Sequence, residues 1–357
     1  MEEPLKKTTK IVAAFAAAAL AFGVAPAATA ANATKACLAL DTGGVDDKSF
    51  NASAWAGANA AKKANANVTV SYLAAATDAD YAPNIKKLVD EKCDIIVGVG
   101  FLINSAIVDA AKKNPTVKFA IVDQDGEDHG ADGSVYPGKK IANLKPLEFA
   151  TNESAFQAGY LAAGVSKTGK VATYGGLNIP PVTIFMDGFA KGVAHYNAKK
   201  GKSVQVLGWD TKKADGTFVG GFSDSAKALQ ISKNFEQQGA DVIFPVAGGL
   251  GGATAGNSIA SKKSVVIWVD TDGFVAAPQY KKVLLTSVVK GVDTSVKGVI
   301  LDVASNKFSS TGYVGTLKNG GTKLAPYHDL IRMVPSALRA EVTKLGTDIS
   351  NKKVSVK

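Results

Sequence analysis

The sequence predicts an α/β protein with two doubly wound lobes built on parallel sheets. The chain has 357 residues, more than one ordinary hydrophobic core contains, so two domains are expected. Short runs rich in Val and Ile alternate with helix-like segments, a pattern typical of parallel strands covered by helices on both faces. The alternation runs through residues 36–148 and again through residues 149–272, which predicts one lobe for each series.

The expected elements follow in order along the chain. In the first series we expect strands at residues 36–41, 68–73, 94–99 and 118–122 and helices at 50–64, 82–91 and 105–113. In the second we expect strands at 170–174, 204–207, 242–245 and 265–269 and helices at 153–165, 183–199, 225–238 and 252–262. A strand (283–288), a helix (292–306), an extended stretch (312–317) and a last helix (335–345) follow. We therefore assign residues 36–148 and 273–308 to lobe 1, residues 149–272 and 309–345 to lobe 2, and residues 346–357 to a C-terminal tail.

The N-terminus is typical of a secretory signal peptide spanning residues 1–30. Its basic start holds Lys6, Lys7 and Lys10. An apolar, Ala-rich run over residues 11–24 follows, and Ala-Thr-Ala at residues 28–30 offers a cleavage site between small residues. The run is short for a membrane span, although a retained N-terminal anchor is the alternative. We expect the mature chain to be exported, to the periplasm or the extracellular space.

The net charge of +10 raises the possibility of a nucleic-acid partner, but the composition argues against it. The arginines are Arg332 and Arg339 alone, whereas phosphate and guanine recognition favours Arg. The lysines are scattered in pairs along expected helices, as at residues 62–63 and 86–87, which indicates a solvated lysine face. We expect no nucleic acid partner.

Two cysteines, Cys37 and Cys93, remain after export to an oxidising compartment. Each opens a short apolar run. If these runs are neighbouring parallel strands, both sulfurs lie at the same end of the sheet, and we predict a disulfide between them. Two separate buried thiols are the alternative.

The strongest local signal is Asp-Thr-Gly-Gly-Val-Asp-Asp-Lys-Ser-Phe-Asn at residues 41–51. It leaves the first strand at its carboxyl end and enters a helix, and its two glycines allow a tight turn close to a ligand. Asp46, Asp47 or Ser49 could cap that helix. The next two residues are Phe50, which presents a ring near the strand end, and Asn51, which presents an amide. A capped turn with a core phenylalanine is the alternative interpretation.

Other strand ends also carry polar groups. Asp123 and Asp270 end strands, and Lys290 ends the strand after residue 283. A glycine-rich turn at residues 247–252 precedes a helix. Each signal is weak alone because strands often end in Asp, but together with Asp41 they predict one polar rim. Carboxylates accept hydrogen bonds from hydroxyl and ring N–H groups, and an ammonium donates them, which suits a polyhydroxylated neutral ligand.

A second aromatic ring could complete the site. Phe222, just before a helix of the second lobe, and Phe185 are the candidates, and a core role is the alternative for either.

Five segments, in order, resemble the basic membrane protein (Bmp) family of ABC-transporter substrate-binding components, which includes purine nucleoside receptors. The likeness runs from about residue 36 to residue 327. It implies a type I periplasmic-binding-protein fold, with three crossings between the lobes and closure around the ligand. The chain lacks the lipobox cysteine that many members use for tethering, which puts membrane anchoring in doubt. The similar segments are residues 41–51, 153–163, 244–249, 268–272 and 286–291.

The resemblance also implies roles for particular residues. Nucleoside-binding members stack the base between two phenylalanines, which match Phe50 and Phe222. The base-reading Asp of the family falls on Asp123, with Asp125 as a nearby competitor. Further matches are Asp270 and Lys290 for holding the ribose, and Asn51 and Gly248 for additional hydrogen bonds.

We therefore expect a monomeric solute-binding protein that captures a nucleoside in the cleft between its lobes and delivers it to an ABC permease. No cofactor, metal or catalytic residue is expected. A receptor for a sugar or another small polar solute is one alternative, and a sensor that presents its lobes to a membrane receptor is another. A nucleoside hydrolase is the enzymatic alternative, but the leading Asp of its calcium motif falls on Ala39, which offers no ligand oxygen. The three histidines, His129, His195 and His328, all lie outside the motifs.

Overall fold

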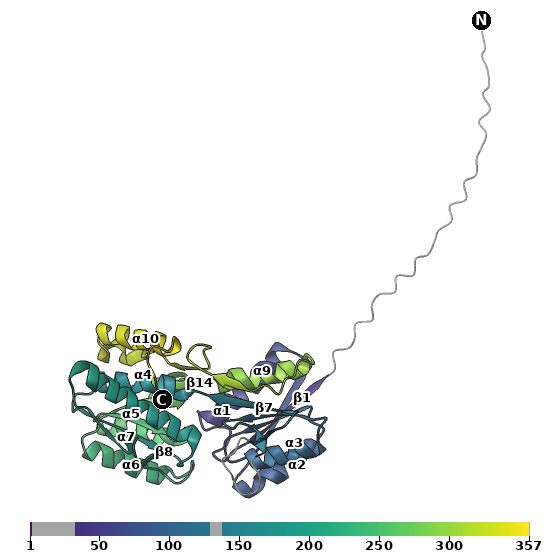
Figure 1. Ribbon diagram of the computed structural model, residues 1–357, viewed down its shortest axis with the longest axis horizontal. Helices are drawn as coiled ribbons and strands as arrows, with labels where there is room; N and C mark the ends of the chain where they lie inside the picture. The colour runs from purple at the N-terminus through teal and green to yellow at the C-terminus, as the bar shows by residue number, and fades with distance from the viewer. Residues whose placement is uncertain (2–32, 129–137, 357) are drawn as a thin grey trace. The chain divides into compact units, whose positions relative to one another are not determined.

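The computed structural model describes Met1, residues 33–128 and residues 138–356. The predicted signal segment lies outside the described residues apart from Met1, as does His129. Two six-stranded sheets form within one unit, residues 32–357 (Figure 1). We call each sheet with its packed helices a lobe. The predicted α/β class is confirmed, with mostly parallel sheets and helices on their faces.

The sheet of lobe 1 has the order β15-β7-β4-β3-β1-β2, with every neighbouring pair parallel. Its central strands are buried because helices cover both faces. Along β1, Leu38 and Leu40 face a core with α1 and α9, while Cys37 and Ala39 face a core with α2 and α3. The strands are β1 (Thr34–Leu40), β2 (Val68–Ala74), β3 (Ile95–Val99), β4 (Lys118–Val122), β7 (Leu144–Phe149) and β15 (Tyr313–Gly315), and the helices are α1 (Phe50–Ala64), α2 (Tyr81–Asp90), α3 (Asn104–Lys113) and α9 (Val292–Ala304).

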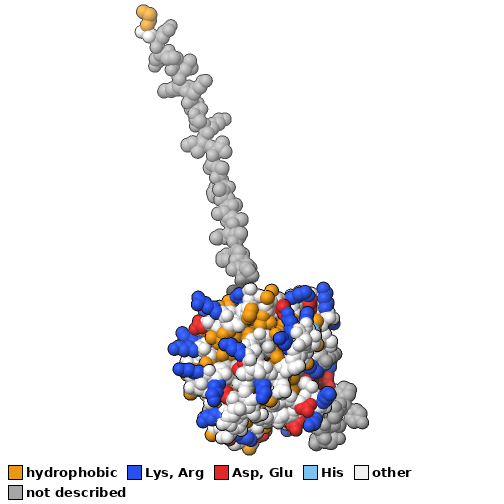
Figure 2. All heavy atoms as spheres, turned by 90° about the vertical axis from the view of Figure 1, so that its left-hand side faces the viewer, with side chains coloured by type: hydrophobic (Ala, Val, Ile, Leu, Met, Phe, Trp, Pro, Cys, Tyr) orange, Lys and Arg blue, Asp and Glu red, His pale blue; other side chains and the backbone are white. Residues whose placement is uncertain are grey.

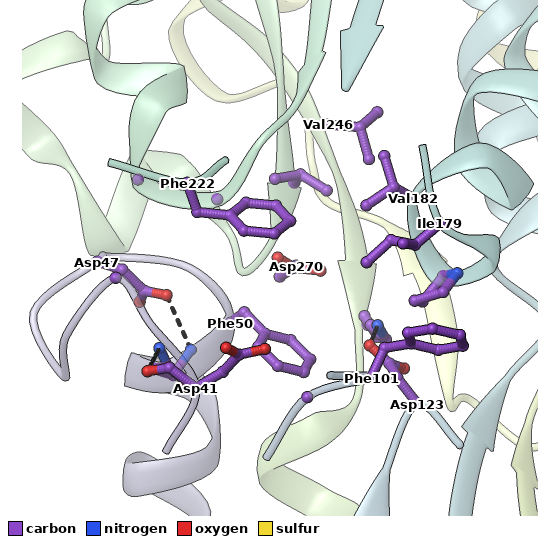
Figure 3. Close-up of a pocket in the computed structure, with 18 of the residues that line it drawn as sticks. Asp41, Asp47, Phe50, Phe101, Asp123, Ile179, Val182, Phe222, Val246 and Asp270 are labelled. Carbon is purple, nitrogen blue, oxygen red and sulfur yellow. Dashed lines mark hydrogen bonds and ion pairs between the residues drawn. The ribbon is translucent and has the colours of Figure 1, made fainter. Parts of the chain in front are cut away.

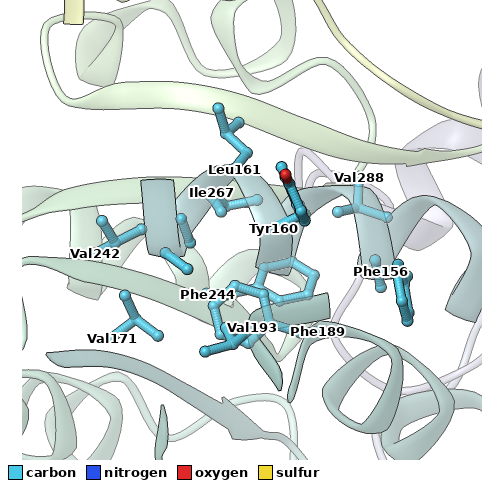
Figure 4. Packing of buried hydrophobic residues seen from close by; sticks show 14 of the residues in the cluster. Phe156, Tyr160, Leu161, Val171, Phe189, Val193, Val242, Phe244, Ile267 and Val288 are labelled. Carbon is cyan, nitrogen blue, oxygen red and sulfur yellow. The ribbon is translucent and has the colours of Figure 1, made fainter. Parts of the chain in front are cut away.

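The sheet of lobe 2 has the order β16-β14-β13-β12-β8-β9, parallel except for β16. Its main core lies between this sheet and helices α4, α5 and α10, where Phe189 packs on Phe244 with ring centroids 5.4 Å apart (Figure 4). The strands are β8 (Lys170–Gly175), β9 (Gln205–Leu207), β12 (Val242–Val246), β13 (Val265–Asp270), β14 (Leu284–Lys290) and β16 (Thr322–Leu324), and the helices are α4 (Thr151–Val165), α5 (Pro180–Lys200), α6 (Ser225–Gln237), α7 (Gly251–Ser261), α8 (Gly273–Ala276) and α10 (Ser336–Ser350).

Smaller elements decorate the two lobes. They are the strand pairs β5 (Glu127–Asp128) with β6 (Lys139–Lys140) and β10 (Trp209–Asp210) with β11 (Asp215–Gly216), and the 3-10 turns η1 (Asp78–Asp80), η2 (Gly248–Leu250), η3 (Pro278–Tyr280) and η4 (His328–Met333).

The chain passes from one lobe to the other three times: from β7 to α4, from β14 to α9, and from β15 to β16. This arrangement differs from the predicted division in three places. Strand β14 pairs with β13 in lobe 2, although residues 273–308 were assigned to lobe 1. Strand β15 pairs with β7 in lobe 1, although residues 309–345 were assigned to lobe 2. The expected tail from residue 346 begins inside α10, and Val354 and Val356 pack on the lobe 2 core.

The predicted disulfide is present between Cys37 and Cys93, whose Cα atoms are 6.0 Å apart. The strand pairing explains it, because β1 and β3 are parallel neighbours and Cys37 lies opposite Ile96, three residues after Cys93. The bridge therefore joins the middle of β1 to the segment just before β3.

Positive charge is dispersed over the face of the molecule that Figure 2 shows. On the face shown in Figure 2, lysine and arginine side chains lie among uncharged and hydrophobic atoms and do not form one continuous band. None of the helices in the described ranges is long and apolar enough to cross a bilayer.

Candidate functional site

A cavity lies where the carboxyl ends of the two sheets meet. In an open parallel sheet, ligands bind where the strand order reverses, because the loops there diverge to opposite faces. The reversal falls between β1 and β3 in lobe 1 and between β8 and β12 in lobe 2. The space measures about 650 Å³ including its open mouth. Its lining comprises Asp41, Thr42, Gly43, Asp47, Phe50, Asn51, Gly100, Phe101, Asp123, Ile179, Pro181, Val182, Phe185, Phe222, Val246, Gly248, Gly249, Val269, Asp270 and Lys290.

All eight predicted ligand-binding residues line this cavity, although they are spread over 250 positions of sequence. Asp125, the competitor of Asp123, is absent from the lining; its Oδ1 accepts the backbone N–H of Glu127 at 3.0 Å. The structure thus brings the predicted set together, while their contact with a ligand remains a prediction.

The loop after β1 is shaped by Asp47. Its carboxylate accepts backbone N–H groups of Ser49 at 2.9 Å, Asn51 at 2.9 Å and Ala52 at 3.0 Å, and so caps the start of α1. Of the three capping candidates in the sequence, Asp47 is therefore the one that caps. Burial raises the pKa of Asp47, and these N–H donors offset part of that effect. The cap fixes Phe50 and Asn51 on the first turn, facing the cavity.

Asp41 is held entirely by groups of its own lobe. Its Oδ1 accepts the hydroxyl of Tyr81 and, at 2.6 Å, the backbone N–H of Thr42. Burial raises the pKa of Asp41, while the Tyr81 hydrogen bond acts in the opposite direction. The loop after β3 approaches so closely that a Cβ at Gly100 would lie 2.2 Å from Asp41 Oδ2, and the φ of Gly100 is +125°. Only glycine fits there.

Asn51 offers an unused acceptor to the cavity. The residue is 2% exposed, and its Nδ2 reaches the carbonyl oxygens of Asp41 and Thr42 at 3.4 and 3.5 Å. Among the described residues, its Oδ1 has no hydrogen-bond partner. A buried amide oxygen without a partner is costly, so a ligand donor at this point would satisfy it.

A buried ion pair between the two lobes forms part of the cavity wall. Lys290 Nζ, at the end of β14 in lobe 2, contacts Asp123 Oδ2, at the end of β4 in lobe 1, and their side chains are 3% and 8% exposed. Burial raises the pKa of Asp123, and the ammonium offsets part of the effect. The ammonium also lies 4.8 Å from the ring centroid of Phe50 and 5.7 Å from that of Phe185, within reach of cation–π attraction.

Asp270 ends β13 in a left-handed backbone conformation, with φ of +66°. Such a conformation is uncommon for a residue with a side chain and is concentrated at functional sites. Its Oδ2 accepts the hydroxyl of Ser49 at 2.7 Å, a contact from the other lobe. Burial raises the pKa of Asp270 to about 6, with Lys290 and the Ser49 hydrogen bond acting in the opposite direction.

Two rings enter the cavity from opposite lobes. Figure 3 shows Phe50 on α1 and Phe222 on the loop before α6 projecting into the same space. Phe222 lies against Gly176, where a Cβ would be 2.2 Å from the ring. Phe185, the competing candidate, is 2% exposed and packs on Phe244 in the lobe 2 core. The geometry therefore favours Phe222 as the second ring facing a ligand.

Sequence reasoning missed several lining residues, most clearly Phe101 and Ile179. They lie on the loops after β3 and β8, at the two reversals of strand order. Both loops follow strands that the sequence predicts. Assigning them to the site required the order of the strands in the sheets, which a local pattern does not contain.

The lobes also touch directly beside the cavity. The carbonyl oxygen of Lys48 in lobe 1 accepts Trp268 Nε1–H at 3.3 Å and the Thr271 hydroxyl at 2.8 Å, both from lobe 2. Together with the Ser49–Asp270 and Asp123–Lys290 contacts, these bonds hold the two rims around the space.

Comparison with known proteins identifies the chain's relatives. The sequence model of the Bmp family, described as ABC transporter substrate-binding protein PnrA-like, matches residues 34–357. The chain belongs to the Bmp family. It is therefore an ABC-transporter substrate-binding protein, of a family that acts outside the cytoplasm.

Individual relatives agree with this membership. The ABC transporter nucleoside-binding protein BmpA of Lactococcus lactis is 32% identical over 339 residues, covering 90% of this chain and 88% of that protein. Basic membrane protein A1 of Borrelia garinii is 28% identical over 330 residues, covering 90% and 88%. A solute-binding protein of an ABC transporter from Aeropyrum pernix has a similar structure, with a TM-score of 0.76 at 23% identity, covering 90% of this chain and 92% of that one. This last likeness supports the type I periplasmic-binding-protein fold.

Proposed function

We propose that this Bmp family member captures a nucleoside, with a purine base, in the cavity between its lobes and delivers it to the permease of an ABC importer. The observation that carries the proposal is the pair of rings, Phe50 and Phe222, projecting from opposite lobes into a cavity with a polar wall. Two aromatic faces suit a flat heteroaromatic base. The nucleoside-binding relative in Lactococcus lactis is consistent with it.

The polar groups supply the remaining contacts. We assign the edge of the base to Asp123 and the ribose hydroxyls to Asp270 and Lys290. Because Asp123 and Lys290 are in contact, they bind neighbouring parts of the ligand. Asn51 Oδ1 accepts a further donor, and the turn at Gly248 offers backbone groups.

We further propose that the chain binds without catalysing a reaction, acts as a monomer, and reaches its compartment through cleavage after residue 30. The resemblance of its aspartates to a calcium motif has a structural explanation, because the Asp47 carboxylate accepts three backbone N–H groups as a helix cap. His328 is bonded to Asp272, which does not line the cavity.

The test is calorimetric titration of the mature protein after unfolding and refolding, with the disulfide intact, to remove ligand carried from the expression host. The panel is adenosine, guanosine, inosine, cytidine, uridine and ribose. We expect tight one-to-one binding of purine nucleosides, weaker binding of pyrimidine nucleosides, and none of ribose. Silence across all nucleosides from a folded protein would contradict the proposal, and tight binding of ribose would favour a sugar receptor. Chromatography of each mixture after incubation should show no free base.

A further inference from the structure

Ser49 occupies a position that its sequence context does not explain. It directly precedes α1, where a serine commonly caps the helix, yet its side chain makes no capping bond because Asp47 already serves that purpose. The residue is fully buried, and its hydroxyl lies 2.7 Å from Asp270 Oδ2 and 3.2 Å from the carbonyl oxygen of Val269. The Ser49 hydroxyl, at the start of a lobe 1 helix, therefore bonds to lobe 2 and leaves its own helix uncapped by this side chain.

Asp270 accepts the hydrogen bond that this hydroxyl donates. A hydroxyl has a single proton to donate, and the shorter distance and the charge favour the carboxylate over the Val269 carbonyl. The hydrogen bond that the structure shows for the Asp270 side chain comes from Ser49. Its left-handed backbone places the carboxylate at the end of β13, where the Ser49 hydroxyl donates to it.

We propose that Ser49 is a positioning residue that sets the Asp270 carboxylate in its ligand-accepting orientation across the contact between the lobes that the structure shows. Recognition thereby depends on both lobes, because lobe 2 presents its carboxylate correctly only while Ser49 of lobe 1 is bonded to it. The identity of the ligand in this inference rests on the proposed function, but the Ser49–Asp270 link does not.

The proposal predicts a titration signature. The charged groups that face Asp270 are Lys290 from β14, Asp123 from the end of β4 and Asp47 from the loop before α1. Ser49 adds a donor that stabilises the ionised carboxylate. Burial raises the pKa of Asp270 and the Ser49 hydrogen bond lowers it. The pKa of Asp270 should therefore be higher in a variant that lacks the Ser49 hydroxyl.

The experiment compares Ser49→Ala with the matched control Thr271→Val. The control removes another hydrogen bond between the lobes, from Thr271 to the Lys48 carbonyl, without touching Asp270. Dissociation constants for the tightest nucleoside of the panel are measured from pH 5 to pH 8. For Ser49→Ala we expect affinity to be about tenfold lower than in the wild type at pH 7.5. On acidification, the affinity of this variant should begin to fall at a higher pH than that of the wild type. For Thr271→Val we expect roughly a two- to threefold loss with the wild-type pH dependence.

A second readout needs no ligand. The carboxyl carbon of Asp270, assigned by its disappearance in Asp270→Asn, is titrated by NMR in the wild type and in Ser49→Ala, and the variant should titrate at higher pH. Identical titrations in the two proteins would overturn the proposal, as would equal losses of affinity in Ser49→Ala and Thr271→Val with unshifted pH profiles. If the wild type bound no nucleoside, the proposed function would fall, and the carboxyl titration would still decide the role of Ser49.

Discussion

Asp41 and Asp270, one carboxylate from each lobe, are held in different ways. Asp41 directly follows the central strand β1 and Asp270 ends the central strand β13, and both are buried at the rim of the cavity. Asp41 is held by Tyr81 and Thr42, which belong to its own lobe. Asp270 is held by Ser49 of the opposite lobe. Lobe 1 therefore places the Asp41 carboxylate by itself, whereas lobe 2 places the Asp270 carboxylate through contact with lobe 1.

The same contrast explains how closure would be coupled to binding. A ligand shifts a conformational equilibrium only through contacts that differ between the two states. Docking on lobe 1 alone would use Asp41, Asn51 and Phe50, while the contacts from Asp270, Lys290 and Phe222 become available as lobe 2 arrives. These later contacts are the ones that favour the closed arrangement.

The largest expected effect on binding comes from removing the lobe 2 carboxylate. Asp270→Ala should weaken nucleoside binding by ~2–4 kcal/mol, because a charged hydrogen bond is lost and a ligand hydroxyl is left without an acceptor. Calorimetric titration measures the change. Asp272→Ala, two residues further along the same rim but outside the cavity lining, is the control and should bind nearly as the wild type does. Wild-type affinity in Asp270→Ala would remove this residue from the site.

The next largest effect on binding should come from removing either aromatic ring of the cavity. Phe50→Ala and Phe222→Ala should each weaken binding by ~1–3 kcal/mol, by analogy with base–aromatic stacking elsewhere. Similar losses would show that the two lobes contribute equally to the base contact, and an unchanged constant in either variant would move the base away from that ring.

Phe185→Ala provides the matched comparison for Phe222. Because Phe185 belongs to the lobe 2 core, its truncation should lower the free energy of unfolding by ~3–5 kcal/mol. Urea unfolding measures this change. A Phe185→Ala protein of normal stability that failed to bind would make Phe185 the stacking ring.

Acidification should weaken binding by a smaller amount. Burial raises the pKa of Asp270 to about 6, and a ligand that needs the ionised form binds fully above this pH and less as pH falls through it. Affinity should decrease by roughly tenfold between pH 7 and pH 5. Titrations at several pH values check the slope, which Asp270→Asn should flatten. Constant affinity over this range would show that the carboxylate is not used.

The disulfide should affect stability and leave binding unchanged. It joins the middle of β1 to the segment just before β3, away from the carboxyl ends of both strands. Replacing both Cys37 and Cys93 by Ala should lower the free energy of unfolding by about 2–4 kcal/mol without altering the dissociation constant. A changed dissociation constant in a folded double variant would mean that the disulfide helps to position Asp41 or another lobe 1 residue of the cavity.

Local sequence patterns were sufficient to predict the fold class and the polar rim. Continuous Val and Ile runs specify buried parallel strands, and charged residues directly after them lie at the carboxyl edge whatever the strand order. Asp41, Asp123, Asp270 and Lys290 were found in this way, and the resemblance selected Phe222 over Phe185 and Gly248 within its glycine-rich turn. The disulfide followed from the same reasoning about parallel neighbours.

Pairing and cross-lobe contacts lay beyond those patterns. Residues 284–290 form a strand in either lobe equally well by composition, and only their pairing with β13 assigns them to lobe 2. Phe101 depends on the strand order, and the role of Ser49 depends on the approach of a strand 220 positions later. Such features depend on tertiary geometry, about which a local sequence pattern contains no information.

The central claim is that a nucleoside lies between the lobes with its base between two rings. A crystal structure of the refolded protein with the tightest nucleoside of the panel tests it most directly. We predict the base between Phe50 and Phe222, with sugar hydroxyls on Asp270 and Lys290 and the Ser49–Asp270 hydrogen bond intact. A nucleoside bound to lobe 1 alone, or outside the space between the two rings, would contradict the account.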